Sequence, residues 1–190
     1  IAIDGVMQPC LTVLELRHLS SGPCMQFVRD KRIRFQHCDA AGIVFNPQYL
    51  VLCNELIEDW FTEGLGVDYA CLHRDARLGT PMIRVEADFL RASGLGDTLA
   101  FHLTVERVGA ASLHLSIEAR AADEPRFRAR LKLALMSLDT MRAVPIDETW
   151  RARFTDYLGG PETKAESMPS VHDRETAPAD GSNPSDRPSC

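Results

Sequence analysis

The sequence has no excess of basic residues. Its 190 residues include 27 Asp and Glu against 21 Lys and Arg, which gives a formal net charge of −6. Proteins that bind nucleic acid neutralise phosphates with clustered Lys and Arg side chains, so this balance argues against a nucleic-acid partner. A small anionic ligand stays compatible with it, because a few well-placed arginines can bind one whatever the net charge.

Long hydrophobic runs and paired cysteines are also missing. The apolar stretches are far shorter than a membrane span, and no basic segment leads into an apolar block near the start. The six cysteines are irregularly spaced, and no Cys-x-x-Cys pair predicts a zinc site or a redox pair. These absences predict no membrane partner, no bound metal and a reducing, cytoplasmic location.

Both ends of the sequence differ in composition from its middle. Residues 1–24 have mixed character and are interpreted as an N-terminal extension outside the folded unit. Residues 159–190 are dominated by Pro, Ser, Gly, Ala and acidic residues. Such a stretch buries too little apolar surface to offset its ordering entropy, so a disordered C-terminal tail is predicted. The folded domain is expected over 25–158.

The middle of the chain combines one helical pattern with several strand patterns. Apolar residues recur at helical spacing from Pro47 to Glu63, and Gly64-Leu65-Gly66 then ends the helix. Residues 26–35 suit a first strand, and 149–158 a short closing helix. Apolar and polar residues alternate in four later runs, at 83–89, 99–106, 113–118 and 127–135. Because each run predicts one buried face, the expected fold is α+β, with a five-stranded antiparallel sheet wrapped around one long helix.

The segment between the first strand and the helix carries the most chemical information. Asp39 supplies a carboxylate, and Ala40-Ala41-Gly42 lets another molecule approach the backbone closely. Asn46 followed by Pro47 predicts an N-cap and a first helical residue, where unpaired N–H groups favour negative charge. An acid close to an oxyanion-binding helix start is suited to attack on a carbonyl. The same residues also suit an acidic turn followed by an ordinary helix cap.

A family resemblance rests on two segments. Residues 37–49, His-Cys-Asp-Ala-Ala-Gly-Ile-Val-Phe-Asn-Pro-Gln-Tyr, resemble the signature of the 4-hydroxybenzoyl-CoA thioesterase family, within the hot dog fold superfamily. Residues 79–83, Gly-Thr-Pro-Met-Ile, are similar to the start of that family's second strand. The resemblance implies the hot dog fold, which is the same arrangement of sheet and helix that the periodicity predicts.

The resemblance also implies hydrolysis of an acyl-CoA thioester, with CoA as part of the substrate and no separate cofactor. A thioester carbonyl is electrophilic and its thiolate leaves readily, so a base or nucleophile and an oxyanion donor suffice. Asp39 is implied as the base or the nucleophile, and the backbone N–H around Asn46 as the oxyanion donor. Asn54 is a candidate to meet a polar ring substituent, or is a solvated helix residue. The full set of expected substrate-binding residues is Gly42, Phe45, Asn54, Gly79 and Thr80.

The chain departs from known branches of the family. The tol-pal-cluster branch of short-chain acyl-CoA thioesterases has a histidine in place of Asn46 and a tyrosine in place of Phe35, which disfavours that branch. The 4-hydroxybenzoyl-CoA enzyme has a basic cluster where this chain has Gly109-Ala110-Ala111. Contacts to the CoA phosphates must then come from other basic residues. The alternative is that these residues only form a solvated face of a strand. The candidates are Arg107, Arg128, Arg130, Lys132 and Arg142.

These patterns predict an acyl-CoA thioester hydrolase for an aromatic or other bulky acyl group. Two alternatives stay open. One is a 3-hydroxyacyl thioester dehydratase on the same fold, which would pair a histidine base with a helical acid. The other is a non-catalytic acyl-CoA-binding protein. A homodimer or homotetramer is expected, because one protomer would leave a sheet edge and its pocket open.

Overall fold

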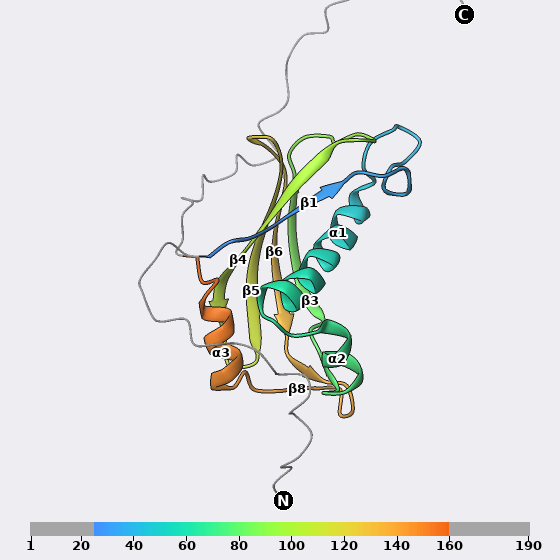
Figure 1. Cartoon of the computed structure of the whole chain (residues 1–190). Coiled ribbons are helices and arrows are strands. Elements are labelled where there is room, and N and C mark those ends of the chain that lie inside the picture. Colours follow the sequence, from blue (N-terminus) through green and yellow to red (C-terminus); the bar gives the residue numbers. More distant parts are fainter. Residues whose placement is uncertain (1–24, 160–190) are drawn as a thin grey trace, which may run out of the picture.

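The computed structural model describes residues 25–159, in which a curved sheet packs against one long helix (Figure 1). The helix is α1 (Asn46–Asp59). The sheet is antiparallel, with the strand order β1-β4-β5-β6-β3. Its strands are β1 (Phe27–Arg32), β3 (Met82–Phe89), β4 (Thr98–Val108), β5 (Ser112–Ala121) and β6 (Glu124–Ala134). The expected extension at 1–24 and nearly all of the expected tail at 159–190 lie outside the described residues.

The core lies between α1 and the inner face of the sheet. Leu56 of α1 is fully buried, as are Phe101, Leu115 and Ile117 of the middle strands. The helix continues into a single π-helical turn, η2 (Trp60–Gly64), and the chain leaves it through Gly66, which has a φ of 66°. Gly66 suits this exit because glycine enters the left-handed region without steric cost. No helix among residues 25–159 is long and apolar enough to cross a membrane.

Several short elements were not predicted from the sequence. A second, three-stranded sheet joins β2, β7 and β8, each only two residues long, which is too short for any period to show. The first strand is also shorter than expected, because residues 35–37 turn into a 3₁₀ helix. The other short elements are η1 (Phe35–His37), α2 (Tyr69–Arg74), β2 (Leu78–Gly79), β7 (Met136–Ser137) and β8 (Arg142–Ala143). The closing helix expected at 149–158 is present as α3 (Glu148–Thr155).

Strand β3 corrects one expectation. Its alternating pattern predicted a buried apolar face, yet Ile83 is 54% exposed, Val85 39% and Phe89 47%. The reason is position, because β3 is the last strand of the sheet and no further strand of residues 25–159 pairs with its outer edge. The sheet therefore ends in a long strand with apolar side chains and unpaired backbone groups, which in other proteins is a site of pairing with another chain.

Candidate active site

Asp39 lies at the start of a tight hairpin between η1 and α1. Cys38 and Val44 form an antiparallel bridge, and the Asp39 N–H donates to the Ile43 carbonyl at 3.0 Å. Gly42 closes the turn by donating its N–H to the Asp39 carbonyl at 3.0 Å, with a φ of 76° that glycine adopts without strain. The small residues of the motif thus build a tip with almost no side chains beside the carboxylate.

The Asp39 carboxylate is exposed to solvent. One of its oxygens, Oδ1, accepts a hydrogen bond from the Ala41 N–H at 2.9 Å, which orients the side chain over its own hairpin. Within residues 25–159, no Lys, Arg or His lies within ion-pair distance of it. The carboxylate is therefore accessible to a substrate, and it keeps lone pairs free for accepting a proton or attacking an electrophile.

The helix start lies one residue earlier than expected. Phe45, not Asn46, is the N-cap, with φ and ψ of −65° and 124°, so Asn46 is the first helical residue and Pro47 the second. The reason is that the Phe45 N–H donates to the His37 carbonyl at 2.9 Å, which keeps Phe45 in the second arm of the hairpin. Proline tolerates this place because an N–H in the first turn has no helical partner.

One backbone donor of this first turn is left for a ligand. The Gln48 N–H donates to the Phe45 carbonyl at 2.8 Å, and Pro47 has no N–H. The Asn46 N–H makes no backbone hydrogen bond with any residue that the structure describes. The hairpin that carries Asp39 on one arm therefore leads directly to a helix terminus with an available N–H on the other.

Ser93 and Tyr49 hold this hairpin against the sheet. The Val44 N–H donates to the Ser93 carbonyl at 2.9 Å, and the Tyr49 hydroxyl donates to the buried Ser93 Oγ at 3.0 Å. Burial raises the pKa of Tyr49, so its phenol stays protonated and able to donate. Its ring stacks on Phe127 at a centroid distance of 4.6 Å. Sequence reasoning gave neither Tyr49 nor Ser93 a role, since neither carries the reactive group.

The other expected substrate residues do not gather around Asp39. Gly42 and Phe45 share its hairpin, and Phe45 is 52% exposed. Asn54 is exposed farther along α1, a helix of 14 residues and hence about 21 Å in length. Gly79 and Thr80 follow α2, which lies at the far end of α1 from the hairpin (Figure 1). One protomer thus presents two separate groups of these residues.

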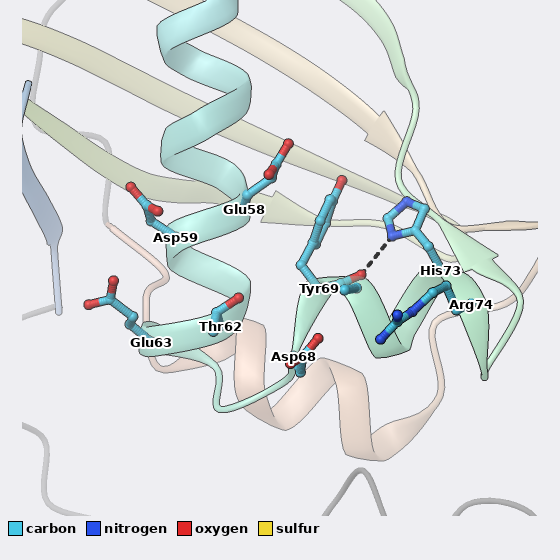
Figure 2. Close-up of a pocket in the computed structure, with 9 residues that line it drawn as sticks. Glu58, Asp59, Thr62, Glu63, Asp68, Tyr69, His73 and Arg74 are labelled. Carbon is cyan, nitrogen blue, oxygen red and sulfur yellow. Dashed lines mark hydrogen bonds between the residues drawn. The ribbon is translucent and has the colours of Figure 1, made fainter.

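Thr80 has a polar environment of its own. Its Oγ1 is 3.1 Å from the Tyr69 hydroxyl, and buried Gly79 lies next to Leu138 and His73. Beside Tyr69 is a pocket of about 500 Å³ between the end of α1 and α2 (Figure 2). Figure 2 also shows the His73 Nδ1 paired with the Tyr69 carbonyl, at 2.9 Å. The pocket is lined by Glu58, Asp59, Thr62, Glu63, Asp68, Tyr69, Ala70, His73 and Arg74.

The five phosphate candidates fall into two classes. Arg128 and Arg130 lie in ion pairs, with Glu118 and Glu106 respectively. Arg107, Lys132 and Arg142 have no carboxylate within ion-pair distance among residues 25–159. Only these last three therefore keep an uncompensated charge for a ligand.

The comparison with protein families identifies the domain. Residues 33–154 match the family described as the thioesterase-like superfamily. This chain belongs to that superfamily. The match covers the Asp39 hairpin, α1 and all of the sheet except β1, so the expected hot dog fold is confirmed for this superfamily member.

Several proteins similar to this chain carry names that specify aromatic acyl-CoA thioesters. A 1,4-dihydroxy-2-naphthoyl-CoA hydrolase of Nostoc punctiforme is 27% identical over 99 residues, which are 52% of this chain and 66% of that protein. The protein of the same name from Synechocystis is 24% identical over 133 residues, covering 68% and 95%. A solved gentisyl-coenzyme A thioesterase superposes with a TM-score of 0.62 at 24% identity, covering 67% and 98%.

Proposed function

We propose that this chain is an acyl-CoA thioesterase that releases an aromatic carboxylic acid and CoA. The observation that carries the proposal is the hairpin of residues 38–45, which places an exposed carboxylate on one arm and ends at the unpaired Asn46 N–H. The names of these similar proteins support the substrate class, because both the 1,4-dihydroxy-2-naphthoyl group and the gentisyl group are hydroxylated aromatic acyl groups.

The proposed reaction uses the two ends of this hairpin. The thioester carbonyl oxygen accepts a hydrogen bond from the Asn46 N–H, which stabilises the negative charge that develops there. Asp39 takes a proton from water while the water oxygen bonds to the carbonyl carbon, and the carbon–sulfur bond then breaks to release the CoA thiolate. In the nucleophilic version, an Asp39 oxygen bonds to the carbonyl carbon and the carbon–sulfur bond breaks to release the CoA thiolate. Water then opens the resulting anhydride, which frees the carboxylic acid and regenerates Asp39. Both versions proceed without a metal or a separate cofactor.

The proposed site is completed by a second copy of the chain, paired along β3. Two β3 strands related by a two-fold axis would run antiparallel and cover the exposed Ile83, Val85 and Phe89. Antiparallel pairing brings the start of one β3, which follows Thr80, beside the end of the other, which leads to Ser93 and the Asp39 hairpin. Residues that one protomer keeps apart would then contact the same substrate.

Thiol release from a panel of aryl-CoA and alkyl-CoA thioesters tests the activity. Asp39→Asn should lower kcat by at least about a hundredfold, since it removes the only acid proposed to act on the carbonyl. Asp123→Asn, in the exposed turn between β5 and β6, is the matched control and should leave kcat unchanged. Near-wild-type turnover by Asp39→Asn would refute the mechanism.

Product analysis on a 3-hydroxyacyl-CoA tests the dehydratase alternative. His73 and the helical Glu58 line one pocket, which is the pair of residue types that such a reaction requires. Formation of an enoyl thioester without free thiol would favour that alternative, and tight binding without any product would favour the acyl-CoA-binding protein.

Subunit mixing tests the shared site. Asp39→Asn and Thr80→Val homodimers should both be impaired, whereas mixed dimers regain one intact site when Asp39 of one copy works with Thr80 of the other. Val85→Lys should give a monomer by light scattering and lose activity with it, because a charged side chain would lie in the seam. Full activity of that monomer would exclude the shared site.

A further inference from the structure

Four basic side chains lie in one row across the outer face of the sheet. Arg107 of β4 is directly opposite His114 of β5, His114 is opposite Lys132 of β6, and Lys132 is opposite Arg84 of β3. The neighbours of His114 and Lys132 along their strands, among them Leu113 and Leu133, are buried in the core. Because side chains alternate along a strand, the row therefore faces away from the helix and from the Asp39 site.

Two β-bulges place the outer members of this row. In β4 the pair Val105–Leu115 is followed by Arg107–His114, so Glu106 is the extra residue. In β3 the pair Met82–Leu133 is followed by Arg84–Lys132, so Ile83 is the extra residue. Regular strands would set Glu106 opposite His114 and Ile83 opposite Lys132. The bulges therefore place Arg107 opposite His114 and Arg84 opposite Lys132, where regular strands would have Glu106 and Ile83. Bulges are known to redirect side chains in this way beside functional sites.

The charges in the row are only partly compensated. Arg84 pairs with Glu86, and the nearby Glu106 pairs with Arg130. Neither Arg107 nor Lys132 has a carboxylate within ion-pair distance in the part of the chain that the structure describes. Lys132 and Arg84 are like charges on directly opposite residues, an arrangement that destabilises a sheet unless an anion lies over it.

His114 is a neutral member of the row. Its Nε2 is 2.8 Å from the Arg107 guanidinium, and because arginine can only donate, Nε2 must accept. The proton of the imidazole then belongs on Nδ1. Partial burial lowers the pKa of His114 first, and the charges of Arg107 and Lys132 lower it further, while Glu106 acts in the opposite direction. The row therefore offers a guanidinium, an ammonium and a neutral N–H donor, a set suited to phosphate oxygens.

We propose that Arg107, His114, Lys132 and Arg84 form a phosphate-binding row on the outer face of the sheet. Its ligand is a phosphorylated nucleotide, and the source is the 3′-phosphorylated ADP portion of the CoA thioester, an assignment that rests on the proposed function. In the proposed dimer, the Arg84 end of one β3 lies beside the Asp39 end of the other. Because the row and the partner's hairpin lie on opposite faces of the paired sheet, the pantetheine arm of a CoA bound at the row would pass around the end of the seam to reach that hairpin.

Calorimetry with adenosine 3′,5′-bisphosphate tests the row without any turnover. Arg107→Gln and Lys132→Gln should each weaken binding about tenfold, and the double variant more, because each loses a charge-assisted hydrogen bond. Arg128→Gln is the matched control, since it lies on the same face and strand as Lys132 but pairs with Glu118. It should change binding less than threefold. Absence of binding by the wild type, or equal losses in the control, would overturn the proposal.

Two further experiments distinguish CoA from other phosphate ligands, and distinguish failure of the phosphate-binding row from failure of the proposed thioesterase function. Inorganic pyrophosphate that binds as tightly as the bisphosphate would overturn the assignment to CoA and support a general phosphate site. In turnover, the double variant should raise KM for an aryl-CoA while leaving the N-acetylcysteamine thioester of the same acid unaffected. If the wild type releases thiol from neither thioester, the proposed function fails, and the calorimetry alone decides on the row.

Discussion

The contact between Tyr49 and Ser93 determines how firmly the Asp39 hairpin is held against the sheet. The Ser93 side chain is buried and receives a hydrogen bond of 3.0 Å from the Tyr49 hydroxyl. Tyr49→Phe removes the donor but keeps the stacked ring, and Ser93→Ala removes the acceptor but keeps the backbone bond to Val44. Each single variant leaves one buried hydroxyl without its partner, which costs about 1–3 kcal/mol. The double variant leaves none, so it should cost little more than either single one, with a coupling energy of about 1–2 kcal/mol.

Urea unfolding followed by circular dichroism measures this cycle, with an unchanged m-value as the check for two-state behaviour. Turnover supplies a second readout, because a looser hairpin should lower kcat/KM for the aryl-CoA in both single variants. Tyr157→Phe is the matched control, since its hydroxyl donates to the Gly64 carbonyl, in a different part of the chain, and its loss should reduce stability alone. Additive single variants, or a Tyr157→Phe variant that loses activity to the same extent, would refute the reasoning.

Three further predictions follow from burial and packing. Burial raises the pKa of Tyr49, Tyr69 and Tyr157, so these phenols ionise at lower pH in the unfolded state than in the folded state. The free energy of unfolding should therefore fall as the pH rises above about 10. A free energy of unfolding that stays constant up to about pH 11 would contradict this. Burial also raises the pKa of Cys53 to about 12, so iodoacetamide at pH 8 should alkylate it only in denaturant, as mass spectrometry of digests can show. Gly64→Ala sets a Cβ 2.6 Å from Trp60 Cδ1 and should cost about 1–3 kcal/mol in thermal unfolding. Gly94→Ala, whose Cβ meets only a backbone oxygen at 3.7 Å, should be close to neutral.

The main elements could be predicted because their periods are long and regular. The buried residues Leu99, Phe101, Leu103 and Val105 alternate over a whole strand, and α1 shows its period over more than three turns. The small sheet of β2, β7 and β8 could not be predicted, since two residues define no period. The cytoplasmic location also stays a prediction.

The candidate site shows the same limit at the level of single residues. The motif located the hairpin and its acid, yet Phe45 rather than Asn46 caps the helix, because the backbone bond from Phe45 to His37 overrides side-chain capping preference. Exposure of β3 was also invisible in its alternation. A strand with one apolar face has the same alternating sequence pattern whether a helix of its own chain or a second copy covers that face.

Register is the level at which sequence reasoning fails most completely here. Strict alternation from the buried Val105 would point Arg107 into the core. The sequence suggested Arg107 as a phosphate candidate, but it gave no sign that Arg107 lies in one row with His114 and Arg84. The two bulges change which face of the sheet Arg107 and Arg84 occupy. As a result, four basic side chains from four different strands lie in one row. A single extra residue changes the face of a side chain without changing the composition of its strand. Charge on a sheet must therefore be counted along rows of paired residues, and on the outer face of this sheet such a row runs from the bulge in β4 to the bulge in β3 and contains two side chains, Arg107 and Lys132, without a carboxylate partner among residues 25–159.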